Sequence, residues 1–253
     1  MNPKRLFVLT GASRGLGAAL AELLLASDIV LLTLSRRPDA ALVDKATAAG
    51  ATLEQWAIDV GHDVGAATRL ELWLHQHANA GFTSAALINN AGLLGRVGPI
   101  ERSDAGELAA VLRVDMEAPL LLTAAFLRAT RDWAIDKRVL NVSSGAGRRP
   151  IAGWAGYCAA KAGVDHFSRV VALDEALLPN PARIVSLAPG VIDTDMQGEL
   201  RAADAAGFPE HAHFHELKAS GQLPTPQAAA ARVLAHLRRD DFGREPVADV
   251  RQA

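Results

Sequence analysis

The chain has 253 residues, of which 26 are Lys or Arg, 28 are Asp or Glu, and 50% are hydrophobic. This composition is that of a globular protein long enough to bury a core, and it excludes a disordered, collagen-like or disulfide-stapled secreted chain. The net charge of −2, without a basic block, offers no electrostatic surface for nucleic acid or an anionic membrane. These numbers favour a small-molecule partner.

The sequence shows no targeting or membrane signal. Its most apolar stretches are interrupted by Asp, Glu, Arg or Pro, so no transmembrane helix is expected. Residues 1–5 pass directly into an apolar run, which predicts that no signal peptide precedes the fold. The single cysteine, Cys158, agrees with a reducing compartment. We therefore expect a cytoplasmic protein.

Short apolar runs alternate with longer segments of helical period. The runs are continuously apolar, which is typical of parallel strands covered by helices on both faces. The predicted strands are 6–10, 29–35, 53–58, 86–89, 139–143 and 183–187. The predicted helices are 15–26, 39–49, 63–78, 104–131 and 155–177. This alternation predicts an α/β fold with a doubly wound parallel sheet and helices on both faces.

The chain reads as a single domain over residues 1–253, because no linker, repeat or low-complexity segment divides it. The pattern loosens after Gly190, and residues 195–224 form a polar, histidine-containing segment that we expect to be mobile and to cover the substrate. Thr225 and Pro226 then resemble an N-cap and a first helical residue, which predicts a last helix through Arg238.

The first predicted strand leads into a glycine-rich turn from which a helix begins. Glycines let the backbone turn tightly and approach a pyrophosphate, whose charge is met by free N–H groups and the helix dipole. A purely structural turn is the alternative, but the preceding strand and following helix favour a dinucleotide site. The candidate cofactor-binding residues of this turn are Gly11, Ser13, Arg14, Gly15, Leu16 and Gly17.

The end of the second predicted strand indicates which dinucleotide binds. An acidic residue there accepts hydrogen bonds from the adenosine ribose, whereas arginine accommodates a 2′-phosphate. The chain carries Arg36 and Arg37 at this point, with Arg14 in the glycine turn. A solvated loop surface is the alternative for these arginines. The pattern favours NADP(H) over NAD(H).

A further group of residues suits proton transfer. Ser144 closes a predicted strand, and Tyr157, the only tyrosine, lies four residues before Lys161 in a predicted helix. This spacing puts the phenol and the ammonium on one helical face, where the cation is expected to lower the pKa of the phenol. A chance pair on a solvated helix is the alternative. Together with the glycine turn, these residues favour proton transfer to a carbonyl oxygen.

Several motifs resemble those of the short-chain dehydrogenase/reductase family over essentially the whole chain, namely Thr10-Gly-x-x-x-Gly-x-Gly17, Asn89-Asn-Ala-Gly92, Ser144, Tyr157-x-x-x-Lys161 and Pro189-Gly190 followed by Thr194. The resemblance implies a Rossmann-type fold and hydride transfer between NADP(H) and a carbonyl carbon. It also implies that Lys161 and Tyr157 contact the cofactor. The further cofactor contacts that it implies are Asp59, Val60, Asn90, Ala91, Gly92, Pro189, Gly190, Ile192 and Thr194.

One position departs from the family's pattern. The helix that normally supplies an Asn to the proton relay carries Asp115 in its place. An ionised Asp accepts hydrogen bonds but cannot donate as an amide does. We keep Asp115 as a candidate catalytic residue, with its part in the relay open.

Three segments of the chain, 153–158, 191–197 and 216–223, resemble the sepiapterin reductases within the family. In that subgroup an Asp near the C-terminus holds the guanidine-like edge of the pterin, and Asp249 falls at the matching place. An exposed tail carboxylate is the alternative. Bacterial reductases of benzil-type diketones share the pattern. The candidate substrate contacts are Ser144, Trp154, Met196 and Asp249, although Trp154 would equally suit packing beneath the pocket.

Two other features suggest no separate chemistry. His211, His213 and His215 lie in the segment expected to cover the substrate and have no cysteine or second histidine cluster nearby, so we expect a polar lid and no metal site. Cys158 has no motif that would activate it as a nucleophile and is interpreted as a small buried side chain.

The predicted helix 104–131 has more apolar residues than one stripe requires, and the resemblance implies that it pairs in a homodimer, or within a tetramer.

These observations predict an NADPH-dependent carbonyl reductase in which Tyr157 donates the proton, Lys161 assists and Ser144 fixes the carbonyl. The first candidate for the substrate is a pterin, reduced at its ketone side chain. The alternatives are an aromatic ketone or benzil-type diketone, or a 3-ketoacyl group. A protein that senses NADP(H) without turnover is a remote alternative, since it would not need Ser144, Tyr157 and Lys161 together.

Overall fold

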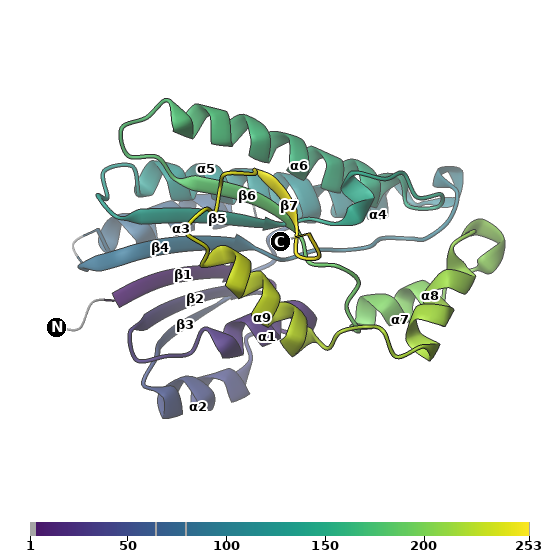
Figure 1. The fold of residues 1–253 in the computed structure, drawn as a ribbon, viewed down its shortest axis with the longest axis horizontal. Helices are drawn as coiled ribbons and strands as arrows, with labels where there is room; N and C mark the ends of the chain where they lie inside the picture. The colour runs from purple at the N-terminus through teal and green to yellow at the C-terminus, as the bar shows by residue number, and fades with distance from the viewer. Residues whose placement is uncertain (1–3, 64, 79, 253) are drawn as a thin grey trace.

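A parallel sheet forms the centre of the molecule (Figure 1). The computed structural model describes residues 4–63, 65–78 and 80–252, and within these ranges the sheet has seven strands in the order β3-β2-β1-β4-β5-β6-β7. The strands are β1 (Lys4–Thr10), β2 (Ile29–Ser35), β3 (Thr52–Ala57), β4 (Phe82–Asn89), β5 (Asp136–Val142), β6 (Arg183–Ala188) and β7 (Val247–Asp249). The structure confirms the α/β fold, and β7 is the strand that the apolar runs did not predict.

Helices cover both faces of the sheet (Figure 1). One face carries α1 (Gly15–Leu23), α2 (Ala40–Ala49) and α9 (Pro226–Leu237). The other carries α3 (Gly65–Gln76), α4 (Ala105–Leu112), α5 (Ala118–Ala129) and α6 (Ala155–Ala176). Among the described residues no helix is both long and apolar enough to cross a membrane.

The two faces explain why the strands are continuously apolar. In β1, Phe7 and Leu9 point into the core that contains α1 and α9, whereas Leu6 and Val8 point into the core that contains α3 and α5. Successive side chains of a strand alternate between its faces, so a strand covered on both sides needs apolar residues at every position.

Side chains at the predicted helix starts cap the first turns. Asp39 accepts a hydrogen bond from the Ala41 N–H, and Asp104 accepts from Gly106 and Glu107. Thr225 accepts from Ala228 before the proline that opens α9, as its sequence predicts. These bonds satisfy N–H groups that the helices leave without partners.

Two segments differ from their predictions. The helix expected over 104–131 is interrupted by a π turn at Arg113–Glu117 between α4 and α5. The segment 195–224, expected to be an irregular loop, contains α7 (Asp195–Arg201) and α8 (His211–Ala219), which project from one end of the sheet (Figure 1). Both helices are short and weakly amphipathic, so hydrophobic periodicity gave little signal. The prediction that no signal peptide precedes the fold rests partly on residues 1–3, which lie outside the described ranges.

Candidate active site

A cavity of about 610 Å³ lies at the carboxyl ends of the strands, where the strand order reverses between β1 and β4. Most predicted site residues line it: Gly11, Ser13, Arg14, Gly15, Leu16, Gly17, Arg36, Asp59, Val60, Asn90, Ala91, Gly92, Ser144, Trp154, Tyr157, Lys161, Pro189, Gly190, Ile192, Thr194 and Met196. Arg37, Asp115 and Asp249 are not part of the lining.

The glycine turn has no room for a side chain where Gly17 approaches the Gly11 carbonyl group. Gly11 and Gly15 have φ values of 71° and 54°, which favour glycine, and a Cβ at Gly17 would lie 2.0 Å from the Gly11 carbonyl oxygen. Helix α1 begins at Gly15, and its N-cap residue Arg14 makes no side-chain capping bond. The N–H groups of the first turn therefore remain available to an anion.

The turn is tied to the loop that follows β4. Thr10 Oγ1 accepts hydrogen bonds from the backbone N–H groups of Asn90 and Ala91, at 2.9 and 3.0 Å. The Asn90 side chain donates in return to the carbonyl oxygens of Thr10 and Gly11, at 3.0 and 3.1 Å. These four bonds fix the separation of the two loops that form one end of the cavity.

Tyr157 and Lys161 come from the first turns of α6, and Ser144 follows β5. Lys161 Nζ lies 5.5 Å from the centre of the Tyr157 ring and donates to the Val142 carbonyl oxygen at 3.1 Å. Ser144 Oγ accepts from the Ala146 N–H at 3.2 Å, which orients the hydroxyl at the end of β5. The structure therefore brings the three predicted residues into one cavity.

The sequence predicted that Lys161 lowers the pKa of the Tyr157 phenol, but in the structure the pKa is raised. Burial raises the pKa of Tyr157 above the ordinary phenol value, while the Lys161 ammonium and the Ser144 hydroxyl act to lower it. The desolvation of the phenolate outweighs the attraction of the cation. The pKa of Tyr157 therefore lies above the ordinary phenol value, so the buried phenol keeps its proton.

Asp115 lies behind these residues in the π turn and is completely buried. Its Oδ1 accepts from the Leu93 N–H at 2.7 Å, and its Oδ2 lies 3.1 Å from Lys161 Nζ. Asp115 therefore contacts Lys161 although it does not reach the cavity surface. Burial alone would lower the pKa of Lys161, but the carboxylate of Asp115 and the neighbouring Tyr157 raise it.

The other half of the cavity is apolar and aromatic. Trp154 stacks on Phe208 with ring centres 5.6 Å apart, and its edge meets Tyr157 at 5.7 Å. The contributors to this half are Leu94, Ile151, Trp154, Met196, Leu200 and Phe214. Trp154 thus both borders the cavity and packs within its wall.

The carboxylate of Asp249 is engaged by its own neighbour. Arg251 donates to Asp249 Oδ1 from Nε at 2.9 Å and to Oδ2 from Nη2 at 2.6 Å. Asp249 is 5% exposed, and these bonds lower the pKa of its carboxyl group below the ordinary value. Arg251 itself lines the cavity, so the tail presents a guanidinium where the sequence suggested a carboxylate.

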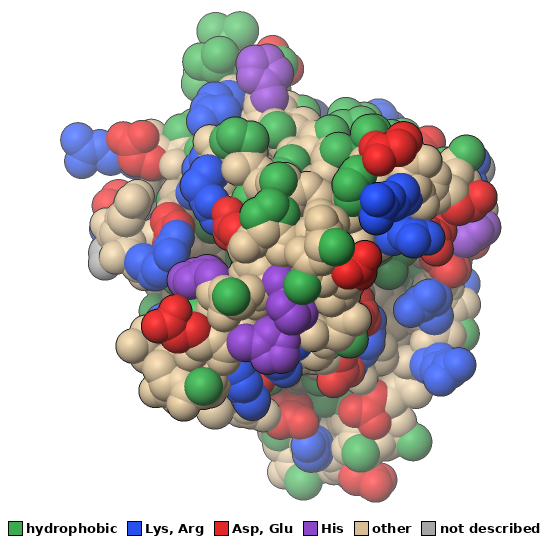
Figure 2. Space-filling model, turned by 90° about the vertical axis from the view of Figure 1, so that its right-hand side faces the viewer, with side chains coloured by type: hydrophobic (Ala, Val, Ile, Leu, Met, Phe, Trp, Pro, Cys, Tyr) green, Lys and Arg blue, Asp and Glu red, His purple; other side chains and the backbone are tan. Residues whose placement is uncertain are grey.

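Helices α7 and α8 form one wall. Glu210, just before α8, accepts from both Nη atoms of Arg149, at 2.5 and 2.9 Å, and both residues line the cavity. His211 and His215 each place Nε2 close to the Arg201 carbonyl oxygen, at 3.0 and 3.1 Å. Figure 2 shows histidines gathered on this end of the molecule. No group of three potential metal ligands occurs among the described side chains.

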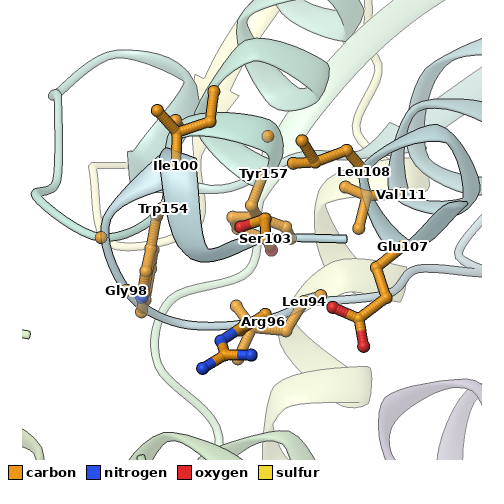
Figure 3. A pocket seen from close by; sticks show the side chains of 14 residues that line it. Leu94, Arg96, Gly98, Ile100, Ser103, Glu107, Leu108, Val111, Trp154 and Tyr157 are labelled. Carbon is orange, nitrogen blue, oxygen red and sulfur yellow. The ribbon is translucent and has the colours of Figure 1, made fainter. Parts of the chain in front are cut away.

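A second, much smaller space lies behind Tyr157. It has a volume of about 10 Å³, enough for about one water molecule, and Tyr157, Trp154 and Leu108 contribute to its lining (Figure 3). A Cβ at Gly156 would lie 3.0 Å from a methyl group of Leu108. The start of α6 is therefore packed closely against α4, which limits the movement of Tyr157.

Several lining residues were not singled out from the sequence: Arg149, Ile151, Leu200, Glu210, Phe214 and Arg251. Those in 195–224 lie in the segment expected to cover the substrate, but no periodicity identified which of them face inward. Arg251 had a recognisable signal. It lies two residues after Asp249, a spacing that lets both side chains fall on one side of an extended chain.

Comparisons with known proteins agree with this geometry. A family model described as short chain dehydrogenase matches residues 5–205. A benzil reductase ((S)-benzoin forming) of Bacillus cereus is 34% identical over 94% of this chain and 96% of its own length. The sepiapterin reductase of Bos taurus is 34% identical over 94% of this chain and 91% of its own.

Solved structures share the fold. A short-chain dehydrogenase/reductase from Burkholderia vietnamiensis is 35% identical, with a TM-score of 0.66 and 99% of each chain covered. A putative 2-deoxy-d-gluconate 3-dehydrogenase from Agrobacterium tumefaciens with bound NADP, 24% identical, has a TM-score of 0.77 and covers 98% of this chain and 95% of its own. The chain belongs to the short-chain dehydrogenase/reductase family and is an oxidoreductase that acts on carbonyl or alcohol groups.

Proposed function

We propose that the chain is an NADPH-dependent reductase of aromatic ketones and 1,2-diketones. The observation that carries this choice is the substrate half of the cavity, where Trp154 meets Tyr157, Phe214 packs against Trp154, and Arg251 is the tail residue in the lining. Aryl groups bury large apolar areas against such walls. The 34% identity to a benzil reductase supports the same class.

Residues of the cavity can perform each part of the proposed reaction. Ser144 holds the carbonyl oxygen and Tyr157 donates its proton to that oxygen. NADPH supplies the hydride when it is bound. Lys161 holds the nicotinamide ribose and faces Tyr157 with its ammonium. Positioning of the carbonyl between Ser144 and Tyr157 is the protein's main contribution to the rate.

The cradle for the dinucleotide fits a phosphorylated adenosine. The Gly11–Gly17 turn leaves backbone N–H groups free at the start of α1. A Cβ at Gly17 would collide with the Gly11 carbonyl oxygen and the Asn90 side chain, so glycine there lets the helix approach the turn closely. Arg36 follows β2 and lines the cavity beside this turn, as does Arg14. We assign Arg36 and Arg14 to the 2′-phosphate, whereas Arg37 lies outside the lining.

Reduction of a pterin side chain is the second candidate. It is supported by the presence of Asp249 and by the 34% identity to a sepiapterin reductase. The contacts of Asp249 weigh against it, because both carboxylate oxygens already accept hydrogen bonds from Arg251. A pterin would have to displace this guanidinium before it reached the carboxylate. A neutral diketone would have no such requirement.

Residues 195–224 are proposed to cover the substrate. Met196, Leu200 and Phe214 supply apolar wall, and the Arg149–Glu210 pair joins this segment to the body of the protein across the cavity mouth. An ion pair between partly exposed side chains contributes little to stability and can open readily. The pair is therefore suited to a cover that releases product.

The apolar surface of α5 and α6 suggests a homodimer. Val170 and Leu173 of α6 are 45% and 70% exposed, Leu177 at the end of this helix is 86% exposed, and Leu120 of α5 is 45% exposed. Large apolar side chains gathered on adjacent helices are typical of a surface that another chain covers. A two-fold axis would bury the same residues of both protomers.

Replacement Tyr157→Phe tests the proton donor. The variant is expected to lose at least about 100-fold in kcat with a diketone, because general acid catalysis typically contributes this much or more. NADPH affinity, measured by fluorescence titration, should change little. Cys158→Ala, at the next residue but outside the main cavity lining, is the matched control and should remain active. Full activity of Tyr157→Phe would contradict the mechanism.

The cofactor assignment predicts different results for two neighbouring arginines. Arg36→Ala should lower kcat/KM for NADPH about tenfold or more and leave kcat/KM for NADH nearly unchanged, since a charged hydrogen bond to phosphate contributes about 1.5–3 kcal/mol. Arg37→Ala, whose side chain does not line the cavity, is the control and should have little effect. Equal losses with both cofactors would rule out a contact with the 2′-phosphate.

Two substrates distinguish the candidate reactions. Wild-type enzyme should reduce benzil with a higher kcat/KM than sepiapterin. Arg251→Ala frees the Asp249 carboxylate and should improve the sepiapterin-to-benzil ratio, and the double variant Arg251→Ala/Asp249→Asn should cancel that gain. If wild type instead prefers sepiapterin and Asp249→Asn abolishes its reduction, the pterin candidate is the correct one.

Light scattering tests the assembly. The wild-type protein is expected to have about twice the 26.6 kDa chain mass, and Leu173→Asp should shift it to the monomer by placing a charge in the buried interface. Val43→Asp is the matched control, because Val43 is 47% exposed on α2, on the opposite face of the sheet. A monomeric wild type would refute the proposal.

A further inference from the structure

The π turn between α4 and α5 places a carboxylate where the family resemblance leads us to expect an amide. Asp115 is the central residue of this turn and has no exposed surface. A π turn inserts one extra residue into a helix and occurs frequently at functional sites. The break in the helix and the unusual residue therefore coincide.

Both carboxylate oxygens of Asp115 have defined partners. Oδ1 accepts the Leu93 N–H at 2.7 Å, and Oδ2 lies 3.1 Å from Lys161 Nζ. Oδ2 forms no hydrogen bond with any described residue, so its contact with Lys161 is an ion pair. An amide could keep the bond from Leu93, but it could not supply a negative charge to the lysine. The difference between Asp and Asn at this position is thus a charge directed at Lys161.

The loop after β4 closes over this ion pair. A Cβ at Gly92 would lie 3.3 Å from Asp115 Oδ2 and 3.7 Å from Lys161 Nζ. The side chain of Lys161 is only 5% exposed, so the pair is nearly shielded from water. Electrostatic interactions at such a site are stronger than those at the surface.

Charged and titratable groups reach Tyr157 and Lys161 from several elements. Asp165 on α6 also faces Lys161, but it is paired with Arg148 at 3.0 Å. The remaining groups are Cys158 on α6, Asp115 from the π turn, and Arg149, Glu210, His213 and Arg251 around the cavity. Asp115 is the fully buried carboxylate among them and is in direct contact with the lysine.

We propose that Asp115 is the counter-ion of Lys161 and a positioning residue that acts on Tyr157 through this lysine. The Lys161–Asp115 ion pair has no net charge, so the ammonium attracts a phenolate less than an unpaired lysine would. Tyr157 then stays protonated, and able to donate, to higher pH. The consequence for catalysis rests on the proposed role of Tyr157 in carbonyl reduction. The charge effect itself does not depend on that role.

The pKa directions of Tyr157 and Lys161 agree with this arrangement. Burial raises the pKa of the Asp115 carboxyl group, whereas the Lys161 ammonium and the Leu93 N–H act to lower it and favour the carboxylate. Burial is the main cause of the raised pKa of Tyr157, and the Asp115 carboxylate adds to it. Replacement of Asp115 by Asn removes a negative charge near the phenol, which favours the phenolate and lowers the pKa. The acidic limb of alcohol oxidation, which needs the phenolate, should move to lower pH by the same amount.

The composition of the chain makes this measurable without turnover. Tyr157 is the only tyrosine, so the rise in tyrosinate absorbance in the near ultraviolet on alkaline titration reports this residue alone. Asp115→Asn is expected to lower the titration midpoint by about one pH unit, a typical effect of a charge at this range. Asp115→Ala, which also lacks the carboxylate, should shift it in the same direction.

Two controls define the result. Tyr157→Phe should abolish the signal, and Glu175→Gln should leave the midpoint unchanged. Glu175 is also a buried carboxylate of α6 paired with a cation, Arg131, but it lies at the far end of the helix. An unchanged or raised midpoint in the Asp115 variants, or an equal drop in Glu175→Gln, would overturn the proposal. Because the titration needs neither cofactor nor substrate, it remains decisive even if the proposed reaction is wrong.

Discussion

The hydrogen bonds between the ends of β1 and β4 are the constraint on which the site depends. Strand order reverses between these strands, so their loops diverge and leave a cleft. Thr10 and Asn90 bond across it and set its width. The glycine turn extends from one side of these hydrogen bonds, and Gly92 covers the Lys161–Asp115 ion pair on the other side. The glycine turn and the proposed proton donor are therefore held in place by the same hydrogen bonds.

A buried ion pair needs a reason beyond stability. Desolvation of two charges costs about as much as their attraction returns, and apolar residues of similar size would often serve the fold as well. Lys161 and Asp115 lie beside the one tyrosine of the chain and below the cofactor cleft. The contrast with Glu175 is useful, because that carboxylate joins Arg131 and the Ala182 N–H between helix and strand ends, where its role is structural. The location of a buried charge, rather than its burial, is what indicates function.

Sequence patterns predicted the parts of the fold that repeat and missed those that depend on a few local contacts. Strands buried on both faces are apolar along most of their length, which made β1, β2, β4 and β6 recognisable. The edge strand β3 is largely exposed and β5 begins with charged residues, and both were recognised from shorter apolar parts. The boundaries of the six longer strands differ from the predictions by up to four residues. Strand β7 has only three residues and follows Pro246, which leaves no run to recognise. The π turn contains the buried charged residue Asp115, and α8 buries only Phe214, so neither follows a hydrophobic period.

The C-terminal tail shows that prediction from sequence has the same limit within the site. The position of Asp249 near the C-terminus follows from the sequence, and a free carboxylate there would suit a ligand with two N–H donors. Whether the carboxylate is free depends on Arg251, and that depends on the path of the chain. The Val250 N–H donates to the Ala188 carbonyl oxygen at 3.1 Å, and the Arg251 side chain passes Gly190 before it returns to Asp249. A residue type at a family position thus defines a possible contact, and the neighbour that competes for its oxygens decides whether a substrate can use it.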